Sequence, residues 1–442
     1  MATPDIGEKA LADLIRFVRD TSPFYQKSLA RLSTENPRLE DLPIVDSDAF
    51  WKANSEKPNG VMTAPFTDGY VVRSGGSTGP PKWVYMTKRE LEVVTKSTGC
   101  AMSKGCGLVP GDRIANLSHH GSMYGSSLLF TANLHEIPMP TVSLPISGNE
   151  GLEAMAKWME VFDATVILTN VSTARRLAEH YQQQGKTLDS VRLILYSGEN
   201  FTKPLRAVYK AAFPNATMYP SLYGSVDAGT IAVPPRPFTD EDDDIHPIYK
   251  TLTDLVILEI VDDHGVPITS PGKIGSLIAT HLHRRQQPLL RYPLGDKASW
   301  VDYHEHTFRL HGRDSSVGLK ISTTHLPLTF LRSVVVEELA KHHNGEIDPV
   351  ASQFLTCYAS PSSHQQVAIV RIATREPVDV ESVISEHFPK RLEQRIAEAS
   401  PTWVKNRGLG NIGPLQVEWI SPEKLVVRKE TGKLVDVIEE RY

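Results

Sequence analysis

The sequence predicts an α/β fold with two domains: a large N-terminal domain with parallel sheets packed by helices, and a small α+β C-terminal domain. Helix and strand patterns alternate from residue 88 to about residue 233, short strands follow up to residue 312, and a separate α+β pattern begins near residue 314. Such alternation is typical of a mostly parallel sheet covered by helices on both faces. We therefore predict domains 1–313 and 314–442, with a small β subdomain at the end of the first.

Helical patterns dominate the first fifty residues. Apolar side chains recur there at helical spacing, namely Leu11, Leu14, Ile15 and Val18. The stretch LEDLPIVDSDAFWKAN predicts a capped helix after a proline, and YVVRSGG predicts a strand that enters a glycine-rich loop. A helix over 88–105 should follow, with Thr87 as its N-cap and Glu90 at the capping-box position.

Strands and helices then alternate regularly. A helix, a strand and a second helix are predicted over EGLEAMAKWMEVFDATVILTNVSTARRLAEHYQQQG. A buried strand with a turn is predicted over VRLILYSGEN, and a helix over FTKPLRAVYKAAFP. Another strand and a polar loop follow in ATMYPSLYGSVDAGTIAV. Ligands bind such sheets at the carboxyl ends of the strands, so we expect the site in these loops. The C-terminal domain should contain a helix through VESVISEHFPKRLEQRIAEA and a basic end, EKLVVRKETGKLVDVIEERY.

Composition narrows the class of protein. Of the 442 residues, 40% are hydrophobic and 22% are charged, and the net charge of −5 argues against a general nucleic-acid binder. No signal core and no membrane-spanning stretch is evident, so a cytoplasmic protein without membrane contact is expected. The three cysteines form no C-x-x-C pair and are interpreted as reduced thiols. The histidine pairs lack partners for a zinc site, and the acidic run 240–244 is interpreted as a solvated loop.

The glycine-rich stretch VVRSGGSTGPPKWVYMT combines small residues, hydroxyls and a lysine in one loop. Glycine lets the backbone approach a ligand, successive N–H groups form an anion site, and Lys82 adds a positive charge. This pattern predicts a loop that grips phosphate. It is neither a Walker A loop nor a dinucleotide-binding fingerprint. A flexible Ser/Gly linker is the alternative.

Five stretches match one family in order: SPFYQKSL, LEDLPIVDSDAF, GGSTGPPKWVYMTKRELE, GSLIATHLHRRQQPLLRYPLGD and VVRKETGKLVDVIEER. Together they resemble the adenylate-forming superfamily, in particular its phenylacetate-CoA ligase branch, over essentially the whole chain. The resemblance implies an enzyme that uses ATP and Mg²⁺ to convert a carboxylic acid into an acyl-adenylate, with release of pyrophosphate. The acyl group then passes to a thiol, and the C-terminal domain is mobile.

The resemblance also implies which residues bind ATP and AMP. The glycine loop would hold the phosphates through Ser74, Gly75, Gly76, Ser77, Thr78, Gly79 and Lys82. Donors that close around the leaving phosphates stabilise charge that grows there. Further nucleotide contacts are expected from Ser197, Gly198, Glu199, Tyr223, Gly224, Asp296 and Arg313. Among these, Tyr223 would stack on adenine, and the Asp296 carboxylate would accept both ribose hydroxyls.

Two residues carry the catalytic expectations. In LYGSVDAG, Asp227 stands where the family usually has Glu, and it is expected to bind Mg²⁺, which prefers oxygen ligands. A loop cap is the alternative role for this side chain. In RKETGKL, Lys433 is expected to reach the α-phosphate and the substrate carboxylate in the transition state. The resemblance also implies a hinge between the domains at Asp314 or Ser315.

The acyl pocket is expected in SHHGSMYG and LYSGENF, where His119, His120, Tyr124 and Tyr196 suit a flat, partly polar acid. Any of these side chains could instead simply pack. We therefore predict an AMP-forming acid–thiol ligase that acts on a small aromatic or heteroaromatic carboxylic acid, with CoA as the second substrate. The alternatives are a standalone adenylating enzyme that serves a carrier protein or an amine in secondary metabolism, and a noncatalytic nucleotide-binding protein. A monomer or homodimer is expected.

Overall fold

The computed structural model describes residues 4–32, 38–74, 82–198, 203–238, 246–313, 318–321, 324–342, 349–359, 365–374, 387–427, 432 and 434–439. It divides into two compact units. The first comprises residues 1–312 with 429–433, and the second comprises residues 313–428 with 434–442. Within the described ranges, no helix is long and apolar enough to cross a membrane.

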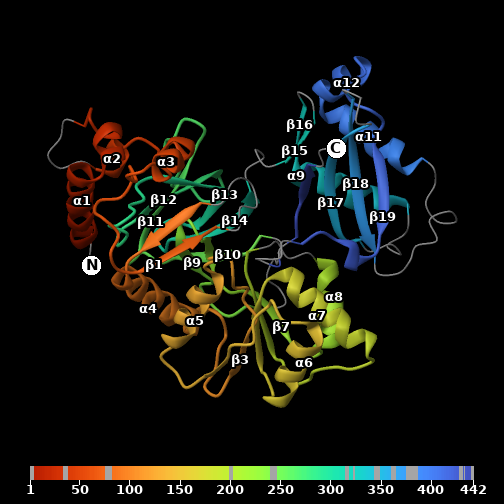
Figure 1. Ribbon diagram of the computed structural model, residues 1–442, viewed down its shortest axis with the longest axis horizontal. Helices are drawn as coiled ribbons and strands as arrows, with labels where there is room; N and C mark the ends of the chain where they lie inside the picture. The colour runs from red at the N-terminus through yellow and green to blue at the C-terminus, as the bar shows by residue number, and fades with distance from the viewer. Residues whose placement is uncertain are drawn as a thin grey trace. The chain divides into compact units, whose positions relative to one another are not determined.

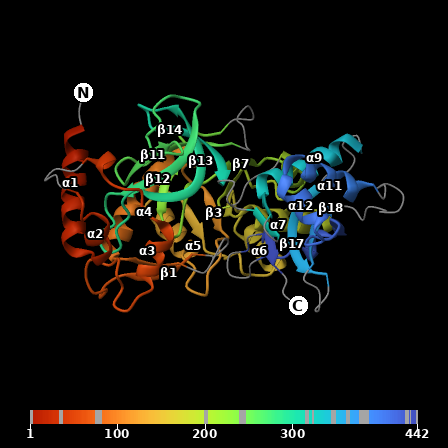
Figure 2. The ribbon, with the colours of Figure 1, turned by 90° about the horizontal axis from the view of Figure 1, so that it is seen from above.

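Three helices open the first unit: α1 (Pro4–Thr21), α2 (Pro23–Ser28) and α3 (Ser47–Asn54). The predicted apolar face of α1 is buried, with Leu14, Ile15 and Val18 fully covered. In both views α1 and α2 lie at the edge of this unit (Figure 1 and Figure 2). The carboxylate of Asp46 caps α3 by accepting from two backbone N–H groups. This cap fixes where α3 begins, and α3 later contributes to the site.

A two-stranded hairpin carries the ends of the glycine loop. Strands β1 (Tyr70–Arg73) and β2 (Trp83–Met86) pair antiparallel, and α4 (Lys88–Gly105) follows. The predicted capping box is present: the Thr87 hydroxyl accepts from the Glu90 N–H, and the Glu90 carboxylate accepts from the Thr87 N–H. The 3₁₀ turn η1 (Leu39–Asp41) precedes this region.

A five-stranded sheet forms the α/β part. Its strands, in spatial order, are β4 (Val142–Leu144), β3 (Arg113–Asn116), β5 (Val166–Thr169), β6 (Leu193–Tyr196) and β7 (Thr217–Pro220). Every neighbouring pair is parallel, as predicted. The covering helices are α5 (Ser126–His135), α6 (Leu152–Val161), α7 (Val171–Gln183) and α8 (Lys203–Ala212). Helices α6, α7 and α8 form one group, whereas α4 packs with α5 (Figure 1).

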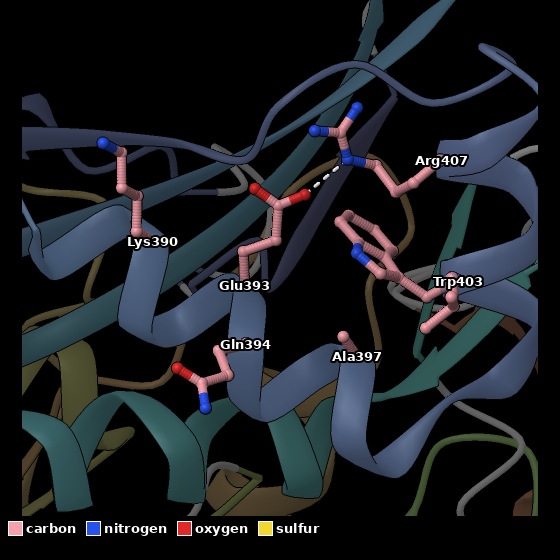
Figure 3. Close-up of a pocket in the computed structure, with 7 residues that line it drawn as sticks. Lys390, Glu393, Gln394, Ala397, Trp403 and Arg407 are labelled. Carbon is pink, nitrogen blue, oxygen red and sulfur yellow. Dashed lines mark hydrogen bonds and ion pairs between the residues drawn. The ribbon is translucent and has the colours of Figure 1, made fainter.

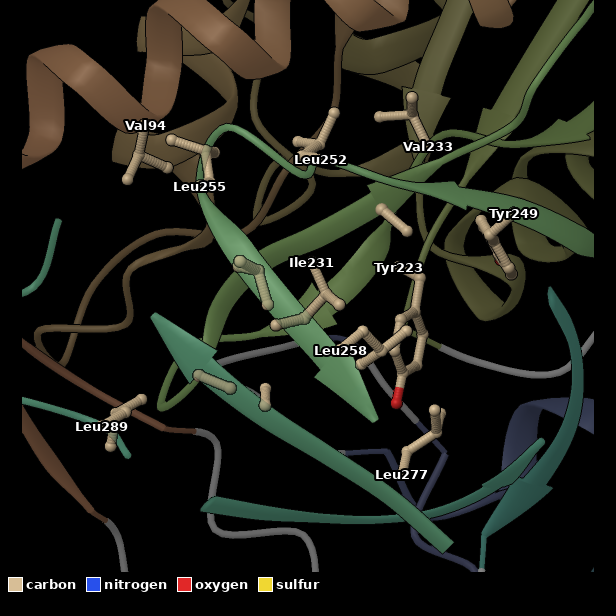
Figure 4. Close-up of a cluster of buried hydrophobic side chains, with 14 of the residues drawn as sticks. Val94, Tyr223, Ile231, Val233, Tyr249, Leu252, Leu255, Leu258, Leu277 and Leu289 are labelled. Carbon is tan, nitrogen blue, oxygen red and sulfur yellow. The ribbon is translucent and has the colours of Figure 1, made fainter. Parts of the chain in front are cut away.

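The β-rich part is larger than the small subdomain that the sequence suggested. Seven strands form one sheet: β11 (Val256–Val261), β12 (Ile274–His281), β13 (Tyr292–Asp302), β14 (Thr307–Arg313), β10 (Ile248–Thr251), β9 (Gly229–Val233) and β8 (Tyr223–Ser225). The polar loop expected within 216–233 thus contributes two strands, which pair antiparallel. Side chains such as Ile231, Leu258 and Leu277 form its buried core beside α4 (Figure 4).

A buried ion pair ties this sheet to the N-terminal region. The guanidinium of Arg291 lies 3.0 Å from Glu259 on β11 and also donates to the Leu42 carbonyl. Both side chains are less than a tenth exposed. A buried charge that loses its partner is strongly destabilising, because its desolvation is no longer compensated.

Glu259→Gln is therefore expected to lower the free energy of unfolding by about 3–5 kcal/mol. Urea titration followed by circular dichroism measures this change. The matched control is Glu40→Gln, which removes the carboxylate of an exposed pair with Arg38 and should change stability by less than about 0.5 kcal/mol. Equal stability of the two variants would contradict this role of the pair.

The second unit is an α+β module. Its four-stranded sheet has the order β19 (Gln416–Ile420), β18 (Gln366–Thr374), β17 (Pro349–Tyr358) and β20 (Val437–Glu439). The strands β15 (Gly318–Ile321) and β16 (Thr324–Pro327) form a hairpin. The helices are α9 (Leu328–His342), α11 (Phe388–Ala399) and α12 (Pro401–Gly408), with the 3₁₀ turn η2 (Pro422–Lys424). The predicted helix through residues 380–399 thus includes α11, and its start lies outside the described residues.

A groove of about 270 Å³ runs between α11 and α12. The buried indole of Trp403 lies beside it, and Glu393 pairs with Arg407 (Figure 3). None of the predicted site residues lines this groove.

Candidate active site

Predicted site residues lie in, or directly after, the loops that follow three of the parallel strands at their carboxyl ends. His119 lies just beyond β3, Ser197 directly follows β6, and Tyr223 lies shortly after β7. Parallel strands end at the same edge of a sheet, which brings these loops to one place as expected. The β1–β2 hairpin adds Ser74 and Lys82, the two described ends of the glycine loop.

The ends of the glycine loop are joined by two hydrogen bonds. The Ser74 N–H donates to the Lys82 carbonyl at 3.0 Å, and the Lys82 N–H donates to the Ser74 hydroxyl at 3.1 Å. These bonds close the base of the loop. The predicted phosphate-binding residues Gly75, Gly76, Ser77, Thr78 and Gly79 lie outside the described residues.

Lys82 and Asp227 form an ion pair although 145 positions separate them. The ammonium lies 2.8 Å from the Asp227 carboxylate, whose side chain is 14% exposed. Burial alone would raise the pKa of Asp227, but Lys82 and hydrogen bonds from Ser225 and Tyr292 lower it to about 2. The carboxylate is therefore charged throughout the neutral range. The Lys82 side chain is 34% exposed, so its ammonium also borders solvent.

Two polar residues that the sequence reasoning missed hold the Asp227 loop and β2. Arg284 donates to the Asp227 carbonyl at 2.5 Å and to the Gln287 side chain at 2.8 Å. Gln287 in turn binds the backbone of Trp83 and Tyr85 on β2. Burying polar groups of this kind destabilises the fold unless they are hydrogen bonded. Here their hydrogen bonds connect the Asp227 loop to β2. The polar run HRRQQP within an otherwise apolar stretch is the sequence signal that could have indicated them.

The predicted adenine and ribose residues lie together. The Tyr223 hydroxyl donates to the Asp296 carboxylate at 2.7 Å, and the Tyr223 ring contacts Tyr249 and Phe308. Only 8% of Tyr223 is exposed, so the ring is largely part of the core (Figure 4). Glycine is required at Gly224, because a Cβ there would collide with the backbone of β9.

The four predicted acyl-pocket residues occupy different surroundings. His119 is buried, and its ring fills the space beside Gly148 and Gly432, where added Cβ atoms would collide with it. His120 is exposed, and its Nδ1 lies 2.8 Å from the Ser147 hydroxyl. Tyr196 ends β6 and is buried, whereas Tyr124 is half-buried beside β1.

The remaining predicted residues are only partly described. Ser197 donates its N–H to the Thr169 carbonyl at 3.1 Å, and Gly198 adopts a positive φ of 75° that favours glycine. Arg313 is the last residue of β14, but its side chain lies outside the described residues, as do Glu199 and Lys433. Gly432, the neighbour of Lys433, belongs to the first unit by its contacts. No group of three or more possible metal-ligating side chains occurs among the residues that the structure describes.

Residues 18–281 match the model of the family described as AMP-binding enzyme, which covers more than half of the chain. The chain belongs to the AMP-binding enzyme family. It is 24% identical over 456 residues to the phenylacetate-coenzyme A ligase of Thermus thermophilus, and the match covers 99% of the chain and 96% of that protein. The predicted membership of the adenylate-forming superfamily is thereby confirmed.

Solved structures show the same fold. A 2-hydroxyisobutyryl-CoA ligase in its postadenylation state aligns with a TM-score of 0.65 at 16% identity, over 98% of this chain and 89% of that one. An acyl acid amido synthetase in complex with 2,4-DB aligns with a TM-score of 0.66 at 13% identity, over 94% and 86%. The predicted fold class is confirmed, and the chain is an AMP-forming ligase of the acid–thiol type.

Proposed function

We propose that the enzyme activates an aromatic or heteroaromatic carboxylic acid with ATP and then transfers the acyl group to CoA. The observation that carries this proposal is the ion pair between Asp227 and Lys82, the residue at the C-terminal end of the glycine loop. It places a cation for phosphate oxygens directly beside a charged carboxylate suited to a divalent metal ion.

In the first step, a carboxylate oxygen of the acid attacks the α-phosphorus of ATP. The bond from this phosphorus to the oxygen that bridges to the β-phosphate breaks, and pyrophosphate leaves. Negative charge grows on the leaving group, and donors at the glycine loop stabilise it. We assign this role to the Lys82 ammonium, the Ser74 hydroxyl and the backbone N–H groups of residues 75–79.

Asp227 fits a Mg²⁺ ion by its chemistry, because its carboxylate is buried, ionised and already bound to a cation. When bound, Mg²⁺ would neutralise phosphate charge and polarise phosphoryl oxygens. Asp227 would hold it, and Lys82 would turn from the carboxylate to phosphate oxygens. The exposure of the Lys82 side chain leaves room for that turn.

Asp296 would accept the ribose hydroxyls while Tyr223 fixes the orientation of its carboxylate. We assign a nucleotide contact to Arg313 and the transition-state contact at the α-phosphate to Lys433. The packing of Gly432 beside His119 supports this assignment, because it brings the backbone next to Lys433 to the proposed acyl pocket.

In the second step, the thiolate sulfur attacks the acyl carbonyl carbon, the bond to the AMP oxygen breaks, and the thiol proton passes to solvent. CoA is the proposed acceptor because the Thermus relative and the aligned hydroxyisobutyryl enzyme are named as CoA ligases. An aromatic acid is proposed because the Thermus enzyme is named for phenylacetate and because the buried side chains of His119 and Tyr196, which follow β3 and end β6, would suit a flat, partly polar acid.

Purified enzyme given ATP, Mg²⁺ and a panel of acids should catalyse pyrophosphate exchange best with aromatic or heteroaromatic members. With CoA added, we expect thioester formation at roughly 1–10³ s⁻¹, the range typical of enzymes. Hydroxylamine trapping measures any adenylate that remains. Trappable adenylate that persists in the presence of CoA would instead indicate a carrier protein or an amine as the acceptor, and exchange only with aliphatic acids would reject the aromatic class.

A further inference from the structure

The hydroxyl of Tyr292, the first residue of β13, joins both members of the Lys82–Asp227 pair. It donates to the Asp227 carboxylate at 3.0 Å and accepts from the Lys82 ammonium at 3.0 Å. The three groups therefore form a closed triangle of hydrogen bonds. Because two of them are charged, these bonds are stronger than those between neutral groups.

Helix α3 holds this hydroxyl from the other side. The Trp51 indole N–H donates to the Tyr292 hydroxyl at 2.8 Å. The two aromatic rings meet edge to face with centroids 6.3 Å apart. The orientation of the hydroxyl is thus set by groups from α3, the end of the glycine loop and the Asp227 loop.

The same two rings border the Lys82 ammonium. Its nitrogen lies 5.1 Å from the Trp51 ring centroid and 5.7 Å from that of Tyr292, within the range of cation–π attraction. Lys82 is therefore confined by two rings, one hydroxyl and one carboxylate. These contacts restrict the Lys82 side chain, which would otherwise populate many rotamers. Part of the entropy cost of ordering Lys82 is therefore met in the free enzyme, before a ligand binds.

We propose that Tyr292, held by Trp51, is a positioning residue for adenylation that fixes the Lys82 ammonium and the Asp227 carboxylate relative to each other. The inference rests on the roles proposed above for Lys82 and Asp227. When Lys82 leaves the carboxylate for a phosphate oxygen, the Tyr292 hydroxyl still accepts from it, and it continues to donate to Asp227. Each group thus keeps a hydrogen bond to the same hydroxyl while the Lys82 ammonium turns toward the phosphate.

A purely structural role is the alternative, in which the Trp51–Tyr292 bond only packs α3 against β13. The two roles differ in what a substitution changes. A packing role predicts lower thermal stability with unchanged catalysis in the folded fraction. A positioning role predicts a lower kcat and a greater need for Mg²⁺, with an unchanged KM for the acid.

Tyr292→Phe keeps the ring and removes only the hydroxyl. We expect kcat for pyrophosphate exchange to fall about 10- to 100-fold, the range for a lost hydrogen bond to a charged group. The Mg²⁺ concentration for half-maximal exchange should rise about 3- to 10-fold, and the KM for the acid should change less than twofold. Trp51→Phe should act in the same direction but more weakly, about 3- to 10-fold in kcat, because the Tyr292 hydroxyl keeps its hydrogen bonds to Lys82 and Asp227.

Two buried aromatic residues away from the site provide matched controls. Tyr209 donates its hydroxyl to the Val171 carbonyl, and Trp300 donates its indole N–H to the Ile268 carbonyl. Tyr209→Phe and Trp300→Phe each remove a comparable buried donor. They should lower the melting temperature without changing the kcat of exchange or its Mg²⁺ dependence.

The Tyr292→Phe/Trp51→Phe double variant tests whether Trp51 acts through the tyrosine. If it does, the double variant should have nearly the kcat of Tyr292→Phe alone, since coupled residues are not additive. Folded Tyr292→Phe enzyme with the kcat and Mg²⁺ dependence of the two controls would overturn the inference. If Asp227→Asn changed the Mg²⁺ requirement in that case, the proposed function would stand without the positioning role. If Asp227→Asn also left the Mg²⁺ requirement of exchange unchanged, the proposed metal role of Asp227 would itself be rejected.

Discussion

Lys433→Ala is expected to lower the rate of ATP–pyrophosphate exchange roughly 10²- to 10³-fold or more, because it removes a positive charge from developing negative charge in the transition state. In the proposed reaction the lysine contacts the α-phosphate and the substrate carboxylate as they combine. The loss should appear in kcat, since the contact is made chiefly in the transition state. Exchange of labelled pyrophosphate into ATP, with a competent acid present, measures it directly.

The second half-reaction separates this role from a general loss of structure. Thioester formation from a supplied acyl-adenylate and CoA should remain nearly intact in Lys433→Ala, since no phosphoanhydride bond is broken in that step. Lys424→Ala is the matched control, because Lys424 is an exposed lysine of η2 in the same C-terminal region. Pyrophosphate exchange at near the wild-type rate in Lys433→Ala would show that the motif had been wrongly assigned.

Asp227→Asn is expected to raise the Mg²⁺ concentration for half-maximal exchange at least about 10-fold and to lower the maximal rate roughly 10²-fold. The amide keeps the size of the side chain but removes its charge. It also leaves the Lys82 ammonium without the carboxylate that lies 2.8 Å away. Exchange rates measured over a Mg²⁺ series at fixed ATP report both effects.

Asp227→Glu restores the residue usual in the family and should retain most of the activity. Asp263→Asn is the matched control, because the Asp263 side chain is 94% exposed and should not affect the Mg²⁺ requirement. The depressed pKa of Asp227 keeps it ionised above about pH 4, so its charge should not account for activity changes between pH 5 and 9. Identical Mg²⁺ curves for wild type and Asp227→Asn would reject the metal role.

Local elements were predictable because their signals lie within a few residues. The burial of Leu14 and Val18 follows from helical spacing, and the Thr87–Glu90 capping box follows from two residues three positions apart. The parallel sheet follows from the order of buried strands and helices, as β5 and β6 show. The family was recognisable for a similar reason, since each of its motifs is a short contiguous stretch.

Other assignments needed the fold. The segment after β7 was expected to be a polar loop, but β8 and β9 in fact join an antiparallel sheet whose other strands continue to Arg313. Glu90 shows, for a single residue, that local sequence patterns do not predict long-range contacts. Its helix-capping role was predictable, but its other carboxylate oxygen accepts from the N–H groups of Arg285 and Gln286, almost 200 positions away.

The sequence by itself determined the local elements, the family and the candidate residues Lys82, Asp227 and Lys433. Only the tertiary structure decided that Lys82 and Asp227 meet, and that Tyr292 and Trp51 surround them. These four side chains come from α3, the end of the glycine loop, the turn after β8 and the start of β13. Helical spacing and caps depend on neighbours along the chain, whereas such contacts depend on which distant surfaces are buried together.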